Sequence, residues 1–480
     1  MKVRKFSCNV IMSVLIISTG TNIAFKSEET KNQLSIQKKI LSPKQIHNSN
    51  LKANKTINLD EIPEILKSKN KELEIMKSRI EQNKYSLRSK IAAWYPSLNL
   101  SSSGFPQYLN ANIDNELSTN TSSDQWKTSI SATIKWDLIN PSRIPDIDES
   151  KDQLEESILN YKIKFREIYL EALNKFFMLQ RSNEYVEIAK KSIEISETSL
   201  KEAEIRLESG IGTKFEVLEA KAQLAKDRQF LIKKVGEKNI NQSSLAKILN
   251  LNRQANPIIN GKTDLIGQWK ISLSESIEAA FKVREEIEKE RIKISINNNQ
   301  IKSSSGSNKP TLSLFNTFSL STAQGEAGVA SPNSSNNIHT QSNTIGLQVD
   351  WPMFNGGSVK ALTKVKKEKQ KELLAQLILK ENEIRHEVEE SFFNLEIAEQ
   401  NISNTKLEVD SAKESLRLAL IRLKAGITTQ REVVTNQRDL TQAEVNHIEA
   451  ITDYNSSLAK LSLQTGINKI NQVLKNEGSK

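Results

Sequence analysis

Apolar positions in two long stretches of the chain recur every seven residues. In each stretch, large residues occupy one heptad position and small residues lie three positions later. The large residues are Val186, Ile193, Leu200 and Leu207 in the first stretch, and Ile402, Val409, Leu416 and Leu423 in the second. Such alternation suits close coiled-coil packing. No Pro or Gly interrupts 146–209, which at 1.5 Å per residue is enough for a helix of about 95 Å. We therefore expect long antiparallel helical hairpins.

Four shorter segments change to a period of two. Residues 130–138 and 345–351 alternate apolar with hydroxyl or charged side chains, and their expected partners lie at 96–105 and 310–320. Ser/Asn-rich segments, 106–124 and 321–340, are expected to be the connecting loops. An apolar and a polar face over about 9 to 11 residues is typical of a membrane-spanning strand. The same hairpins could also pack on the helices of a soluble protein.

Four strands do not close a membrane barrel, because the smallest such barrels have eight. A barrel would therefore be shared between chains, with eight strands in a dimer, twelve in a trimer and sixteen in a tetramer. The sequence pattern does not choose among these assemblies.

The chain repeats itself. Residues 206–224 return as 422–440, with Gly210 on Gly426, which indicates a duplicated unit of helix, β-hairpin and helical hairpin. We predict a first repeat at 57–256 with a β-hairpin at 96–138 and a tip at 210. A linker at 257–270 precedes a second repeat at 271–468, with a β-hairpin at 310–352 and a tip at 426. A polar tail occupies 469–480.

The formal net charge of +10 is concentrated at the N-terminus. Residues 1–56 hold ten basic and two acidic side chains, so the remaining chain is nearly neutral and nucleic acid is not expected as a partner. A basic start and an apolar stretch from Val10 to Ile17 predict a signal peptide at 1–25, followed by a disordered polar leader at 26–56. The only cysteine, Cys8, lies before the apolar stretch, so no disulfide is expected.

Catalytic and cofactor motifs are not apparent. The four histidines lack metal-ligand spacing, and the Gly-Ile-Gly at 210–212 follows a helix rather than a strand. We expect no enzyme activity, metal or cofactor.

Several motifs, in this order and twice, resemble the TolC-like outer-membrane efflux proteins over residues 57–468. Residues 58–75 and 272–289 open the two halves, and 94–100 and 309–315 follow them. The strand-to-helix crossings are 136–141 and 351–357, and each half has one Arg-Leu-x-x-Gly-x-x-Thr tip. The resemblance implies a mainly α fold with a small β part: long coiled-coil hairpins and four transmembrane strands per chain, in a trimeric α-barrel/β-barrel. It also implies a periplasmic helical tunnel, outer-membrane lipid around the barrel, a periplasmic adaptor protein, and an inner-membrane pump or ABC transporter.

The resemblance also assigns roles at the tips. Glu216 and Glu432, six residues after each glycine, match acidic side chains that help gate the periplasmic entrance in this family. An ordinary carboxylate near a helix N-terminus is an equally good interpretation. Leu423 and Thr428 stand where some members have aromatic and basic partners for a closing network.

Other tip residues are candidates for docking an adaptor. Gly210 and Gly426 would allow the left-handed backbone that ends a helix. The preceding pairs, Arg206-Leu207 and Arg422-Leu423, would then be exposed, although both leucines also fit the heptad seam.

Trp136 and Trp351 end the alternating strands, as aromatic residues do at a membrane interface. We therefore expect an outer-membrane conduit for small-molecule efflux or type I protein secretion. The alternative is a periplasmic coiled-coil adaptor or scaffold without a barrel.

Overall fold

The computed structural model describes residues 54–115, 118–252, 256–259, 261–327 and 337–467. The predicted signal peptide, the leader up to residue 53 and the tail at 469–480 lie outside the described residues. The predicted leader is wrong at its end, because Asn54–Thr56 form strand β1, which pairs with β4 (Asn256–Ile258). The Ile57 N–H donates to the Ile258 carbonyl at 2.9 Å and extends this pairing. Backbone pairing thus orders a polar segment that has no apolar pattern.

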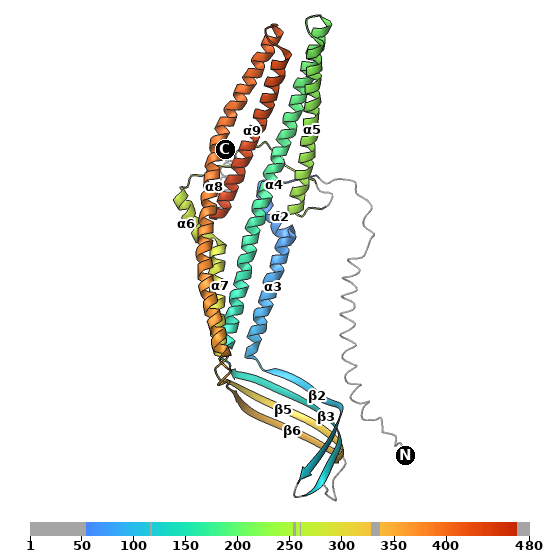
Figure 1. Ribbon diagram of the computed structural model, residues 1–480, viewed down its shortest axis with the longest axis vertical. Coiled ribbons are helices and arrows are strands. Elements are labelled where there is room, and N and C mark those ends of the chain that lie inside the picture. The colour runs from blue at the N-terminus through green and yellow to red at the C-terminus, as the bar shows by residue number, and fades with distance from the viewer. Residues whose placement is uncertain (1–53, 116–117, 253–255, 260, 328–336, 468–480) are drawn as a thin grey trace, which may run out of the picture. The chain divides into compact units, whose positions relative to one another are not determined.

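The same order of elements occurs twice along the chain (Figure 1). The first half contains the short 3-10 helix η1 (Leu59–Glu61), then α2 (Ile62–Lys69), α3 (Lys71–Ile91), η2 (Ala92–Trp94), β2 (Ser97–Asn115), β3 (Ser118–Ile139), α4 (Arg143–Glu208) and α5 (Lys214–Ile248). The second half contains α6 (Leu273–Val283), α7 (Glu285–Gly306), β5 (Thr311–Ala327), β6 (Asn337–Asp350), α8 (Ser358–Lys424) and α9 (Gln430–Thr465).

The two long helices confirm the predicted hairpins. Helix α4 has 66 residues and α8 has 67, and each turns back into a shorter helix at a glycine. Small residues of the seam lie in the packed interior of these hairpins, with Ala189, Ser196 and Ala203 buried in α4 and Ala419 buried in α8. Close helix packing therefore follows from the small heptad positions.

A short helix opens each half and is broken from the next helix at one residue. Asn70 separates α2 from α3, and Arg284 separates α6 from α7; both have extended backbone angles. The Asn70 side chain accepts hydrogen bonds from the N–H groups of Glu72 and Leu73, at 2.9 and 3.1 Å, and so caps α3. Arg284 makes no side-chain cap and has a different set of partners, described below.

The four longer strands form one antiparallel sheet in the order β2-β3-β5-β6. The prediction that 106–124 and 321–340 are connecting loops is wrong, because most of 106–124 and much of 321–340 is strand. The pairing continues past a bulge at Gly104, where φ is +71° and the register shifts between Ser103 and Gln107. Ladder hydrogen bonds join backbone groups, so polar Ser/Asn-rich sequence extends a hairpin as well as apolar sequence does.

Buried apolar residues form three separate clusters along the helices. The largest joins α2 and α3 to α4, α5 and α9 and contains Phe176 and Phe177. A second lies among α6, α8 and α9, and a third, around Leu423 and Val433, lies near the second tip. Among the described helices, none combines the length and the apolarity needed to cross a membrane.

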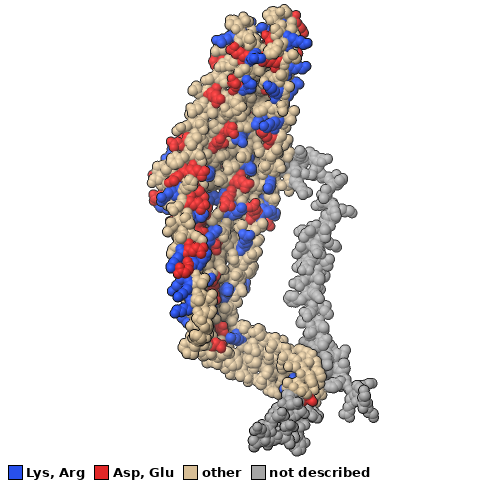
Figure 2. Space-filling view, viewed as in Figure 1, with Lys and Arg blue, Asp and Glu red and all other residues tan. Residues whose placement is uncertain are grey.

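Charged side chains are distributed unevenly between the helices and the sheet. Figure 2 shows basic and acidic side chains interspersed over the helical part, whereas the visible face of the sheet is almost free of them. The interspersed charges indicate solvated helix faces, and the sheet presents a different kind of surface.

Candidate functional site

The two tips share one backbone design. Gly210 and Gly426 both have φ of +73°, the left-handed conformation expected of them. The N–H of Gly210 donates to the Leu207 carbonyl and that of Gly426 to the Leu423 carbonyl, each at 3.0 Å. A Cβ built on either glycine would meet nothing within 4 Å. Backbone conformation rather than crowding therefore favours glycine at both positions.

The first tip has one more backbone hydrogen bond than the second. The N–H groups of Ile211 and Gly212 both donate to the Arg206 carbonyl, at 3.0 and 2.8 Å. A Cβ at Gly212 would lie 2.9 Å from the Arg206 Cβ, so glycine is needed there for space. In the second tip Thr428 takes the place of Gly212, and its hydroxyl is available to other groups.

The two gate candidates have different surroundings. Glu216 belongs to a capping box: its carboxylate accepts from the Thr213 N–H at 3.2 Å, and the Glu216 N–H donates to the Thr213 hydroxyl at 3.3 Å. Glu432 instead accepts from the Thr428 hydroxyl and lies 3.8 Å from Arg422 Nη1. Glu216 is thus held by its own helix end, whereas Glu432 lies exposed among side chains.

The adaptor-docking candidates do not all lie on the surface. Leu207 is 38% exposed, and Arg422 is exposed beside Glu432. The expectation that Leu423 is exposed is wrong: it is 3% exposed and packs with Leu416, Ala419, Val433 and Leu440 in the third cluster. The heptad seam therefore determines its place, and Leu423 is not accessible to a partner.

Arg206 joins the two tips rather than pointing outward. Its Nη1 donates to the Leu423 carbonyl at 3.0 Å, which adds a side-chain hydrogen bond to a carbonyl that already accepts from the Gly426 N–H at the end of α8. Two further contacts connect the hairpins nearby: Gln430 Nε2 donates to the Ser199 hydroxyl at 2.5 Å, and Arg431 pairs with Glu219 at 3.1 Å. The sequence repeat predicted each tip separately and could not reveal these contacts.

A buried polar cluster lies further down between the hairpins. Asp227 of α5 accepts from the Ser196 hydroxyl of α4 and from Gln223 Nε2 at 3.0 Å. Gln437 of α9 reaches into the same cluster, with Nε2 at 2.6 Å from the Ser196 hydroxyl and 3.3 Å from the Asp227 carboxylate. Burial raises the pKa of Asp227, and the hydrogen bonds from Ser196 and Gln223 oppose that rise only in part.

This cluster is not fully satisfied. Among the residues that the structure describes, the buried Gln437 Oε1 has no hydrogen-bond partner. In the same part of the chain no basic side chain forms a hydrogen bond or ion pair with Asp227, although the charge of Lys226 acts on it from a distance. Burying a carboxylate without an ion-pair partner costs free energy of folding. The first hairpin and α9 are therefore joined here by a contact that stabilises less than an apolar seam would.

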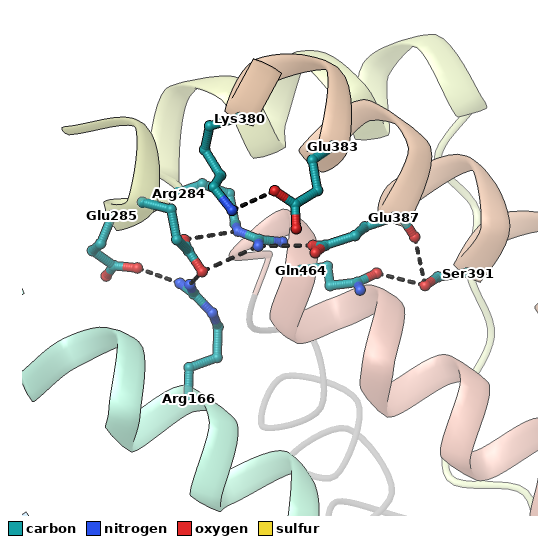
Figure 3. A network of polar contacts seen from close by, with 9 residues as sticks. Arg166, Arg284, Glu285, Lys380, Glu383, Glu387, Ser391 and Gln464 are labelled. Carbon is teal, nitrogen blue, oxygen red and sulfur yellow. Dashed lines mark hydrogen bonds and ion pairs between the residues drawn. The ribbon is translucent and has the colours of Figure 1, made fainter. Parts of the chain in front are cut away.

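A stronger ionic cluster surrounds Arg284, at the break between α6 and α7 (Figure 3). Arg284 Nε donates to Glu286 at 2.9 Å and Nη2 to Glu387 of α8 at 2.8 Å, while Arg166 of α4 pairs with both Glu285 and Glu286. Burial alone would raise the pKa of Glu286, but the two arginines outweigh it and lower that pKa to about 2. This cluster joins α4, α7 and α8 with opposite charges paired.

The two tryptophans lie at the end of the sheet that adjoins the helices. Trp136 Nε1 donates to the Trp94 carbonyl at 3.0 Å, and the Arg143 guanidinium lies 4.4 Å from the Trp94 ring centroid. Trp351 follows the last residue of β6 and is exposed. The motif at 94–100 includes Trp94, but the sequence did not predict its contacts with Trp136 and Arg143, which lie at the turn from strand to helix.

Two edges of the chain carry uncovered groups. In α8, five apolar residues are between 50% and 67% exposed and recur every 14 residues, which is two heptads. We call these five residues the α8 stripe; they are Val365, Leu379, Phe393, Leu407 and Ile421. At the opposite side of the helices (Figure 1), α5 exposes Leu218 and Ile232, also 14 residues apart. Strands β6 and β2 are the edges of the sheet. Open strand edges favour a further strand as partner, and exposed apolar residues that recur every two heptads favour a further helix.

No match was found among curated protein sequences. Solved structures with the same fold include a membrane protein from Pseudomonas aeruginosa, with 17% identity, a TM-score of 0.71, and coverage of 85% of this chain and 93% of that one. The outer membrane protein VceC from Vibrio cholerae matches with 16% identity, a TM-score of 0.69 and coverage of 85% and 96%. The Campylobacter jejuni CmeC outer membrane channel matches with 16% identity, a TM-score of 0.67 and coverage of 92% and 94%.

The family model described as outer membrane efflux protein matches the chain twice, over residues 62–251 and 277–466. Each match extends from an opening helix, through a β-hairpin, to the end of a helical hairpin. The chain therefore belongs to the outer membrane efflux protein family.

Proposed function

We propose that three copies of this chain form a conduit through the outer membrane, with the sheets joined into a twelve-stranded barrel and the helices forming a periplasmic tunnel. The observation that carries the proposal is the sheet: its strands alternate in direction, its edges β2 and β6 are both open, and one face is mostly apolar. Because four is an even number, β6 of one copy can pair antiparallel with β2 of the next without breaking the alternation.

The helical edges support the same assembly. The α8 stripe lies on one side of the chain and the exposed apolar residues of α5 on the other. Contacts between unlike edges generate a closed ring when the rotation closes. The membership of the outer membrane efflux family favours three copies over two or four.

The conduit works with partners at its helical end. A periplasmic adaptor would contact the exposed tip residues, Leu207, Arg422 and Ile427, and an inner-membrane pump or ABC transporter would supply the energy. The cargo is a small molecule for efflux or a protein for type I secretion.

Glu432 is the stronger gate candidate of the two. Three copies of the exposed Glu432 would form a ring of carboxylates at the entrance, each near Arg422 of its own chain, whereas Glu216 is engaged in its capping box. The Glu432→Lys substitution turns this ring positive and should reduce the cation preference of the channel. The matched Glu216→Lys substitution should also weaken the start of α5, which would appear as lower thermal stability.

The direct test is reconstitution of the purified protein in planar lipid bilayers. We expect discrete conductance steps from the wild type. Purified, folded protein that partitions into detergent and gives no conductance, alone or with an adaptor present, would contradict the conduit. Unchanged ion selectivity in Glu432→Lys would contradict only the gate assignment.

A further inference from the structure

One face of the sheet carries an unbroken band of uncharged hydrogen-bonding side chains. The pairing register aligns three successive rows across all four strands, and eleven of the twelve positions are Ser or Thr. The rows are Asn99, Thr133, Thr317 and Thr344; Ser101, Ser131, Ser319 and Ser342; and Ser103, Ser129, Ser321 and Thr340. We call these twelve residues the hydroxyl band.

The hydroxyls of the band bond to one another across the strands. Ser101 and Ser131 lie 2.7 Å apart at their oxygens, as do Ser103 and Ser129, and Ser319 and Ser342; Thr133 and Thr317 are at 3.1 Å. A hydroxyl has one hydrogen and two acceptor positions. In each pair one hydrogen joins the two oxygens, so the other hydrogen and several lone pairs remain available to a solute.

The opposite face has a different character. Residues one position away from the band are mostly apolar, among them Leu98, Leu100, Ile130, Ile134 and Leu320. The polar exceptions in the rows of these five residues are Ser102, Asn316, Gln341 and Asn343. Side chains alternate between the two faces of a strand, so these apolar residues point away from the band. In a closed barrel the apolar face meets lipid and the hydroxyl band lines the lumen.

Charged side chains flank the band and do not enter it. Lys127 lies on the same face beyond one end, and Lys135, Asp137 and Asp350 beyond the other. The three rows span four residues along each strand, about 13 Å at 3.3 Å per residue. On β3 the middle-row residue Ser131 is also four residues from Lys127 and four from Lys135, about 13 Å in each direction. This is more than a Debye length, which is about 8 Å at physiological salt.

We propose that the hydroxyl band makes the barrel lumen indifferent to the sign of charge, so that it passes polar solutes that are cationic, anionic or neutral, and leaves charge selection to the helical entrance. This inference rests on the proposed conduit. Hydroxyls substitute for water as donors and as acceptors, so they solvate solutes of either sign without preferring one. Apolar cargo gains nothing from such a lining.

Cysteine accessibility in the reconstituted channel tests the proposal. In a background of Cys8→Ser, which removes the only native cysteine, the substitutions Ser131→Cys and Ala132→Cys place a thiol on opposite faces of β3. A cationic and an anionic methanethiosulfonate reagent are applied to each channel. For each reagent, the rate of reaction with the channel is divided by its rate of reaction with a small free thiol in solution, so that the two reagents can be compared.

We expect both reagents to reduce the current of Ser131→Cys in up to three steps, with normalised rates that agree within about threefold, and to leave Ala132→Cys unaffected. A pore lined by one sign of charge concentrates counter-ions at least about tenfold, so a skew of that size would overturn the proposal. Adding Ser129→Asp to Ser131→Cys is the control for sensitivity, because a nearby ring of carboxylates should restore such a skew toward the cationic reagent.

The outcomes separate this proposal from the conduit itself. A channel in which Ala132→Cys reacts and Ser131→Cys does not would overturn the hydroxyl band as a lining while leaving the conduit intact. A purified protein that forms no channel in any variant would contradict the proposed function instead.

Discussion

Helices α4 and α8 occupy equivalent places in the two halves and have almost the same length, yet they are buried to very different extents. Helix α4 has 21 buried residues and α8 has nine. Helix α4 packs among α3, α5, α7 and α9, whereas α8 lies at an edge of the chain and exposes its stripe (Figure 1). Helix α4 is therefore largely covered within the chain, whereas α8 has a surface that a second copy can cover.

A pair of adjacent phenylalanines in each long helix shows the same difference in burial between α4 and α8. Phe176-Phe177 in α4 and Phe392-Phe393 in α8 are equivalent in the repeat and form similar edge-to-face ring pairs. Phe177 is 1% exposed and Phe393 is 50% exposed. Identical sequence positions thus serve the core of the chain in one half and its surface in the other.

The largest predicted effect is on the buried phenylalanine. Phe177→Ala should lower the free energy of unfolding by about 3 to 5 kcal/mol, because it leaves a cavity in the largest cluster. Phe393→Ala should change the stability of the single chain little and weaken the assembly instead. Chemical unfolding of the detergent-solubilised protein, together with its oligomeric mass, measures both effects. Equal losses of chain stability in the two variants would contradict the comparison.

The second prediction concerns assembly. Leu407→Glu puts a charge within the α8 stripe, where a second copy would bury it unpaired. We expect a folded chain with unchanged helix content and a much reduced share of oligomer. Lys406→Glu changes the charge at the neighbouring exposed position, outside the stripe, and is the matched control. Wild-type assembly of Leu407→Glu would remove the stripe from the interface.

The third prediction compares the tips. Gly210→Ala and Gly426→Ala should each cost about 1 to 2 kcal/mol, because both φ angles are +73° and no side chain crowds either site. Gly212→Ala should destabilise the first tip by a steric clash between the new Cβ and Arg206. The second tip already has a side chain at the equivalent position, Thr428. Thermal unfolding of the three variants ranks them. A neutral Gly212→Ala would show that the first tip relaxes easily.

The smallest predicted effect is the pH dependence of the contact between the hairpins. Because burial raises the folded-state pKa of Asp227, its contribution to stability is greatest below the ordinary aspartate value and is lost as pH rises through the raised pKa. Asp227→Asn should therefore be slightly more stable than wild type at pH 7, with a difference that shrinks in acid. Thermal midpoints between pH 4 and 7.5 measure this. Parallel pH profiles for the two proteins would show that Asp227 does not titrate in this range.

Periodicity predicted the parts of the fold that depend on local sequence. The uninterrupted stretch 146–209 became α4, the glycines at 210 and 426 became left-handed turns, and the alternating segments became strands. Heptad and strand periods report which face of an element is apolar, so these features are readable without a structure.

Contacts between distant segments were not predictable in the same way. The polar extensions of β2 and β3 are ordered by backbone pairing, which leaves no apolar pattern in the sequence. Leu207 and Leu423 occupy equivalent heptad positions, yet only Leu423 has a cluster to enter. Likewise, nothing local marks Arg206 as a partner of the Leu423 carbonyl, or Asp227 as a partner of Gln437.

The central claim is that the uncovered α8 stripe and the open edges of the sheet are completed by further copies of the chain. The most direct measurement is the native mass of the protein extracted by detergent from the outer-membrane fraction of expressing cells. The account predicts an outer-membrane species with the mass of three chains, each of 54.2 kDa before removal of a leader. A single chain, or a species recovered without detergent from the periplasm, would contradict it.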